Sequence, residues 1–88
     1  MENRSFVFYS ERNVYLSGEL RDGCLKLESE VYGYINSEGH YSLNEEETKK
    51  LLSLISIDEL IEIGKEKHLD GVLSFFIDNS IDYDCIVI

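Results

Sequence analysis

The first half of the chain consists of short runs rich in aromatic and β-branched residues, separated by polar turns. Residues 5–9 and 14–20 predict two strands, because such side chains pack well on a pleated sheet. Residues 30–35 show the same pattern and predict another strand, and a turn at 37–39 leads into a short returning strand at 40–43. We therefore expect the N-terminal half to form a sheet.

The Asp22-Gly23 pair, between two strand-like runs, is the strongest local signal. A two-residue loop of this composition favours a type I′ turn, in which both residues adopt positive φ angles. The turn sets a register with three facing pairs: Arg21 with Cys24, Leu20 with Leu25, and Glu19 with Lys26. The leucine pair is expected to lie toward the core and the charged pair on the opposite face.

Apolar residues recur at helical spacing after residue 44. Asn44 is the expected N-cap of a helix near 45–55, with Glu47 completing a variant of the capping box. Ser56 begins a second capping box, which ends that helix and predicts a new one over 57–67.

The last third of the chain predicts one more helix and a strand. Asp70 is expected to cap a third helix, and Asn79 is expected to end it in a left-handed conformation. Residues 81–88 alternate and are rich in apolar side chains. We expect them to close the sheet, because a loose apolar chain end would fray.

Strands followed by helices predict an α+β domain and not an alternating α/β one. We expect an antiparallel sheet of four to six strands, with two or three helices packed on one face. A chain of 88 residues suffices for a single domain with one modest core. The expected domain, 1–88, holds mainly strands in 1–43, helices in 44–79 and the closing strand in 81–88.

Charge narrows the possible functions. The chain has 18 acidic and 8 basic residues, a net charge of −10. Such a balance argues against direct binding to nucleic acid or to an anionic membrane, which requires clustered Lys and Arg. No apolar run approaches the ~18 residues of a membrane span, and the start leads into no signal-peptide core. We therefore expect a cytoplasmic protein.

Candidate catalytic and metal-binding residues are few. Neither His40 nor His68 has a nucleophile motif around it, and the chain has no Gly-rich phosphate loop. Cys24 and Cys85 lie 61 residues apart, without the spacing of a metal site. This pattern favours surface or capping roles for the histidines and reduced, structural thiols. We expect no enzyme activity, no cofactor and no metal.

Acidic residues recur at four-residue steps in the second half of the chain, and two more lie near its end. The candidate partner-binding residues are Asp58, Glu62, Glu66, Asp70, Asp82 and Asp84. One interpretation is a solvated acidic surface that keeps the protein soluble. The other is a set of anionic contacts for a basic protein, with attraction between opposite charges steering the encounter.

Two function classes follow from these interpretations. The leading hypothesis is a non-catalytic protein-binding module, an inhibitor or immunity-type antagonist of a basic protein that handles nucleic acid. The alternative is a structural or regulatory protein that forms a homodimer through its sheet or its C-terminal tail, with acidity serving only solubility.

The chain resembles a group of small acidic bacterial proteins with no established activity. The segments that carry the resemblance are Leu20-Arg21-Asp22-Gly23 with the following Leu25, Leu27 and Glu28, the tyrosine-containing stretch 32–41, Leu43 to Leu52, and Phe75-Phe76 leading through 79–83 to an apolar strand. The resemblance implies the α+β fold and a bacterial or phage setting. It implies no functional residue.

Overall fold

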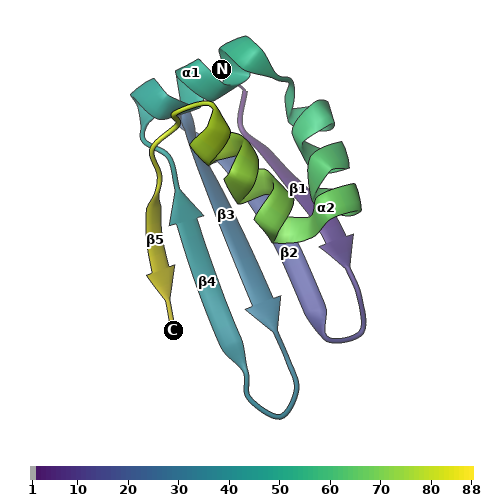
Figure 1. Ribbon diagram of the computed structural model, residues 1–88. Helices are drawn as coiled ribbons and strands as arrows, with labels where there is room; N and C mark the ends of the chain where they lie inside the picture. Colours follow the sequence, from purple (N-terminus) through teal and green to yellow (C-terminus); the bar gives the residue numbers. More distant parts are fainter. Residues whose placement is uncertain (1) are drawn as a thin grey trace.

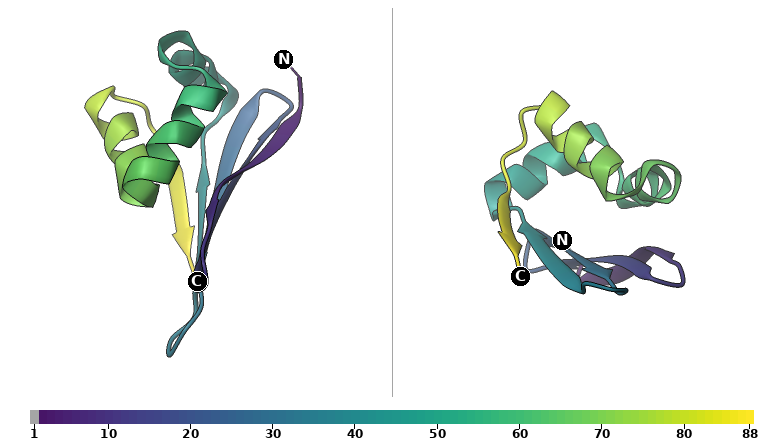
Figure 2. Two further views of the ribbon diagram at one scale, coloured as in Figure 1. Left: turned by 90° about the vertical axis from the view of Figure 1, so that its right-hand side faces the viewer. Right: turned by 60° about the horizontal axis from the view of Figure 1, so that its bottom comes forward.

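A five-stranded antiparallel sheet is covered on one face by two helices in the computed structural model, which describes residues 2–88 (Figure 1). The strands lie side by side in chain order: β1 Arg4–Ser10, β2 Val14–Arg21, β3 Cys24–Val31, β4 Ser37–Ser42 and β5 Asp84–Val87. The helices α1 Glu45–Leu54 and α2 Ile57–Asp78 connect β4 to β5 and lie on the same side of the sheet (Figure 2). The predicted α+β architecture is confirmed.

The turn between β2 and β3 has the predicted geometry. Asp22 and Gly23 have φ angles of 54° and 81°. The three predicted pairs are all present: Arg21 with Cys24, Leu20 with Leu25, and Glu19 with Lys26. Leu25 is fully buried and Leu20 is nearly so, so the leucine pair faces the core as expected.

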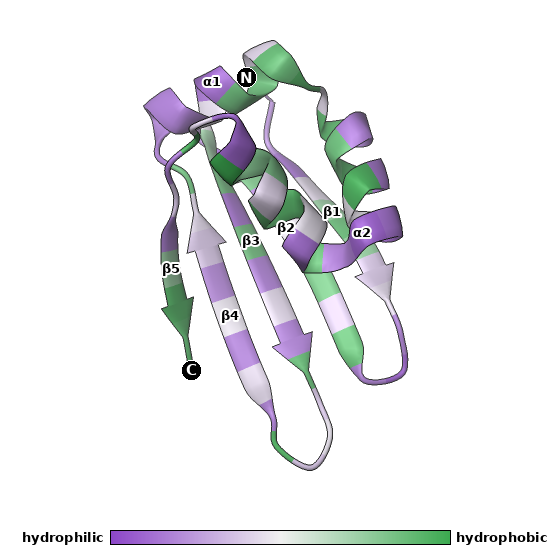
Figure 3. Ribbon diagram, viewed as in Figure 1, coloured by the Kyte–Doolittle hydropathy of each residue, from purple (hydrophilic) through white to green (hydrophobic). Residues whose placement is uncertain are grey.

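The core lies between the sheet and the helices. β2 and β3 alternate hydrophobic and hydrophilic residues along much of their length (Figure 3), and every second residue points toward the helices. The largest fully buried apolar side chains are Phe8, Phe76, Leu16, Leu25, Leu27, Leu43, Leu51, Leu60 and Val72. Burying each such side chain stabilises the fold by about 1.5–3 kcal/mol relative to exposing it.

Thr48 joins α1 to the start of β3. Its side chain is fully buried; its Oγ1 accepts the backbone N–H of Leu25 over 3.0 Å and donates to the carbonyl of Asn44 over 2.8 Å. Asn44 caps α1 as predicted, by accepting the Glu47 N–H over 2.8 Å. The Glu47 carboxylate, however, accepts the backbone N–H of Asp82 over 2.8 Å. It thereby ties the segment before β5 to α1, instead of closing the expected capping box.

The Ser56 capping box of α2 is present as predicted. The predicted break after residue 67 is also present, but it lies at His68, two residues before the cap expected at Asp70. The helix breaks at His68, which has φ 60° and ψ −161°, and continues as the second half of α2. The break turns the chain back over the sheet (Figure 1). Both halves can therefore bury apolar residues, and the His68 ring lies 4.7 Å from that of Tyr9, centroid to centroid.

The expected left-handed residue at Asn79 is also wrong, by one position. Asn79 has φ −105°, and Ser80 has φ 57°. The Ile81 N–H donates to the Phe76 carbonyl and the Ser80 N–H to the Ile77 carbonyl, over 2.8 and 3.1 Å. These bonds form a Schellman motif. The motif directs the buried Ile81 into the core and leads the chain to β5.

The loop between β3 and β4 differs most from the prediction. Residues 32–36 form a loop and not a strand, and β4 already begins at Ser37, inside the expected turn. The reason is that β2 begins at Val14, opposite Val31, so β3 has no β2 residue to pair with beyond that point. The β3–β4 hairpin extends beyond the helical layer (Figure 2).

The closing strand is confirmed in a shorter form. β5 pairs antiparallel with β4, but it spans four residues instead of the expected eight. Within residues 2–88, no helix combines the length and the apolar character needed to cross a membrane.

The close contact between α2 and β1 predicts that adding one methyl group at Gly64 destabilises the fold. A Cβ at Gly64 would lie 2.8 Å from Phe8 Cγ. We expect Gly64→Ala to lower the free energy of unfolding in urea by about 1–3 kcal/mol through overpacking, although alanine favours helix. At Gly33 an added Cβ has no neighbour within 4 Å, so Gly33→Ala is the matched control and should unfold like the wild type. Equal stability of the two variants would contradict the packing.

Candidate functional site

Three of the six predicted partner-binding residues lie together on α2. Asp58, Glu62 and Glu66 are exposed and occupy successive turns of its first half. Arg4 Nη2 donates to Asp58 Oδ1 over 2.7 Å. Lys65 Nζ lies 3.5 Å from Glu62 Oε1. Two of the three charges thus have a basic neighbour within the protein, in exposed pairs that contribute little to stability.

The other three residues lie elsewhere. Asp70 follows the kink at His68, so it does not extend the row of the first half in line. Asp82 and Asp84 lie before and at the start of β5, at the opposite edge of the sheet from β1, against which α2 packs (Figure 1). The structure therefore does not bring the six residues onto one surface, and their role as anionic contacts stays a prediction.

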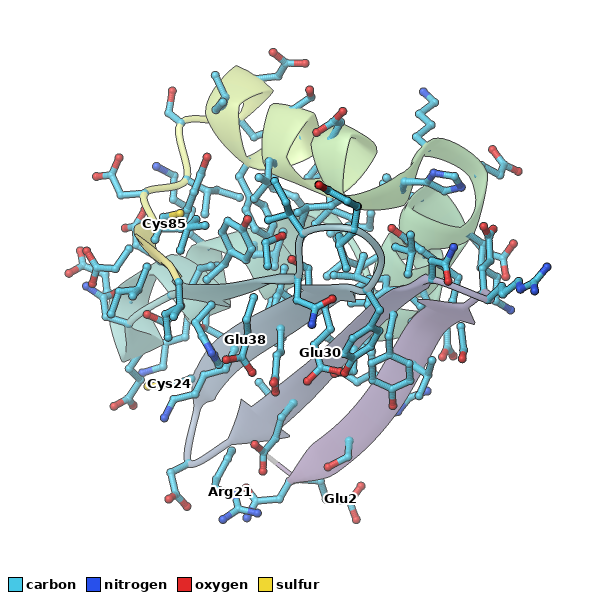
Figure 4. The ribbon with its side chains drawn as sticks, turned by 90° about the horizontal axis from the view of Figure 1, so that it is seen from below. Glu2, Arg21, Cys24, Glu30, Glu38 and Cys85 are labelled. Atoms are coloured by element: carbon cyan, nitrogen blue, oxygen red, sulfur yellow. The ribbon has the colours of Figure 1, made fainter. Side chains whose placement is uncertain are left out.

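A different acidic surface lies on the side of the sheet away from the helices. We call it the acidic sheet face and define it by Glu28 and Glu30 of β3 and by Glu38 and His40 of β4. Since the leucines of β3 point toward the helices, the alternate residues must point away from them. Glu28 pairs with His40 and Glu30 with Glu38, which places all four side chains on the same side (Glu30 and Glu38 are labelled in Figure 4).

Two rows of side chains cross this face from β2 to β5. One row consists of Ser17, Glu28, His40 and Ile86, and the other of Tyr15, Glu30, Glu38 and Ile88. The carboxylates and the imidazole are half-buried. A shallow hollow of about 590 Å³ lies over the first row and extends to Lys26 and β1. Each row therefore places ionisable groups between neutral side chains on rigid strands.

The carboxylates of this face repel one another. Burial raises the pKa of Glu28 above its ordinary value, and a hydrogen bond with Glu38 and the charge of Glu30 raise it further. His40 acts in the opposite direction; its Nε2 lies 3.5 Å from Glu38 Oε2. In the part of the chain that the structure describes, no Lys or Arg forms an ion pair with these three glutamates. Within residues 2–88, the negative charge of these glutamates is thus not neutralised by an ion-paired Lys or Arg.

Glu28, Glu38 and His40 form a group that could hold a metal ion. Their potential ligand atoms all lie within 4.8 Å of one another, and carboxylate with imidazole is a donor set that zinc accepts. Zinc bonds of about 2.0–2.2 Å would require the three side chains to turn inward from their hydrogen-bonded arrangement. Cys24 and Cys85 are free thiols and do not belong to this cluster.

Half of this site was within reach of the sequence. The Asp22-Gly23 turn determines which residues of β3 face the helices, so it already places Glu28 and Glu30 on the open side of the sheet. The position of Glu38 depends on where β4 begins. Because the sequence predicts a strand at 30–35 and a turn at 37–39, it does not show that β4 begins at Ser37.

Comparison with known proteins returns no match. No family model matches the chain, no curated protein is similar to it, and no solved structure resembles its fold closely enough to match. The resemblance to small acidic bacterial proteins stays an expectation.

The raised pKa of Glu28 predicts a pH dependence of stability. A carboxyl whose pKa is higher in the folded than in the unfolded state contributes stability that is present at low pH and lost as pH rises through the folded pKa. Glu28→Gln removes this loss. We therefore expect the stability of the variant relative to the wild type to increase as the pH rises from about 4 to about 7. This interval covers ordinary and raised pKa values of carboxyl groups. Urea unfolding at several pH values measures this difference, and a difference that does not change with pH would contradict the assignment.

Proposed function

We propose that this protein is a non-catalytic acidic protein-binding module. It acts in the cytoplasm as an inhibitor or immunity-type antagonist of a basic protein, of the kind that handles nucleic acid. The observation that carries this proposal is the acidic sheet face, where Glu28, Glu30 and Glu38 have no Lys or Arg ion-pair partner within residues 2–88.

A basic partner fits this face for two physical reasons. Like charges directly opposite each other on neighbouring strands cost stability, and Glu30 and Glu38 are such a pair; a cation placed between them relieves that repulsion. The net charge of −10 attracts a basic protein over a distance, and such steering accelerates association. The strands fix the backbone of these glutamates, so binding has to order only their side chains.

The acids on α2 have a different part in this proposal. The helices cover the other side of the sheet (Figure 2), so Asp58, Glu62 and Glu66 do not share a surface with the acidic sheet face. They contribute to the long-range field, and two of them are already paired with basic side chains.

The alternative function, a homodimer, is favoured by the exposed edge of β5. Within residues 2–88, this strand pairs with β4 alone, and Ile86, Val87 and the following Ile88 are 63–75% exposed. An apolar edge strand without a neighbour is a template for pairing with a second strand. A second copy of this chain would extend the sheet there.

Charge reversal on each surface tests the proposed function. We expect the tagged wild type to capture a basic protein from nuclease-treated bacterial lysate at low salt and to lose it at high salt. Glu30→Lys/Glu38→Lys should weaken binding of the captured protein at least ~10-fold. Glu62→Lys/Glu66→Lys changes the net charge equally and should have a smaller effect. If only the α2 variant loses binding, the helix is the binding surface; unchanged affinity of both variants would contradict the proposal.

Salt also distinguishes the homodimer. Two copies that each carry −10 repel each other, so a dimer formed through apolar β5 contacts should strengthen as salt screens the charge. A complex with a basic partner should weaken under the same conditions. We expect sedimentation equilibrium to show a monomer at both low and high salt. A dimer that tightens with salt and is lost on Ile86→Lys would instead establish the alternative.

A further inference from the structure

A small groove lies at one end of the acidic sheet face, between the β3–β4 loop and the end of β5. Its volume is about 310 Å³, and it is lined by Glu30, Tyr32, Asn36, Ser37, Glu38 and Ile88. The lining thus combines two carboxylates, one aromatic ring and one aliphatic side chain in a space large enough for a single long side chain.

Backbone pairing fixes the base of the groove. Glu30 and Glu38 face each other across β3 and β4, and Ile88 exchanges two backbone hydrogen bonds with Glu38, of 2.8 and 3.1 Å. Tyr15 lies opposite Glu30 on the other side. The two carboxylates are therefore held side by side, with apolar or aromatic groups at both ends of the row.

Hydrogen bonds also hold the wall formed by Tyr32. Its hydroxyl donates to Glu30 Oε2 over 2.5 Å, and this bond is the main reason that the pKa of Tyr32 is raised. The tyrosine therefore stays neutral and keeps its proton near pH 7. The Gly33 N–H donates to Asn36 Oδ1 over 3.1 Å, which closes the loop behind the ring. Tyr32 is half exposed, so part of its ring is open to a ligand.

We propose that this groove binds one arginine side chain of the basic partner. The inference rests on the proposed function and specifies the partner group that the acidic sheet face recognises. A planar guanidinium has several N–H donors, enough to bridge two neighbouring carboxylates, and it stacks on an aromatic ring. Its methylene stem can lie along Ile88, as such stems do on apolar surfaces. A lysine ammonium carries the charge but offers neither the bridging geometry nor the stacking plane.

The exposed tip of the hairpin fits the same contact. Tyr34 is fully exposed and Ile35 is 76% exposed, and both belong to the loop that forms one side of the groove. The tip carries hydrophobic residues at the end of the molecule away from the helices (Figure 3). A partner that places an arginine in the groove therefore also meets an aromatic and an aliphatic side chain, the residue types that contribute most to interface cores.

An NMR titration of the isolated protein tests the groove without knowledge of the partner. The probes are N-acetyl-arginine amide and N-acetyl-lysine amide, added at low salt and followed through backbone amide and side-chain carboxyl signals. We expect saturable shifts at Glu30, Tyr32, Glu38 and Ile88, with the arginine probe bound at least ~3-fold more tightly than the lysine probe. Shifts that do not saturate, or that concentrate on α2, would overturn the proposal.

Matched variants separate this groove from general charge attraction. Glu38→Gln should weaken binding of the arginine probe about 10-fold, since it removes a charge-assisted hydrogen bond. Glu62→Gln removes the same charge from α2 and should leave that binding unchanged. Thermal unfolding checks that both variants fold, and Glu30→Gln replaces Glu38→Gln if the latter does not. Equal affinity of the wild type and the variants for the arginine probe would overturn the proposal that the groove binds arginine. Capture of a basic protein through α2 would still support the proposed function.

Discussion

The turn at Asp22-Gly23 is the constraint on which both faces of the sheet depend. It sets the register of β2 and β3, and a shift of one residue would exchange the side chains of the two faces. With the observed register, Leu25 and Leu27 enter the core. The glutamates that alternate with them must then lie on the open side, where water solvates their charges. One turn therefore determines both the main source of stability and the acidic surface.

Local signals in the sequence predicted the parts of the fold that local interactions determine. The type I′ turn, the Asn44 cap and the Ser56 capping box follow from a few neighbouring residues. The errors arose where distant contacts decide. The loop at 32–36 forms because β2 begins at Val14 and offers β3 no partner residue beyond Val31. For the same reason, the sequence could place Glu30 on the open side but could not show that Glu38 lies opposite it.

The acidic sheet face is the part of the structure that stability alone does not explain. Directly opposed carboxylates weaken the free protein, and natural sheets readily avoid them by pairing opposite charges, as Glu19 and Lys26 do on the neighbouring strands. Here three glutamates share a face with one histidine, and the pKa of Glu28 is raised first by burial and then by its hydrogen bond with Glu38 and the charge of Glu30. A site that is unfavourable in the free protein and favourable beside a cation is typical of a binding surface.

The location of the basic partner on the chain decides between the acidic sheet face and α2 as the binding surface. Cross-saturation NMR of the labelled protein in complex with the captured basic protein measures it directly, because saturation passes only to residues in contact. We expect signal loss along the acidic sheet face and the loop at 32–36, with little effect on the first half of α2. Signal loss concentrated at Asp58, Glu62 and Glu66, with the sheet face unaffected, would contradict this expectation.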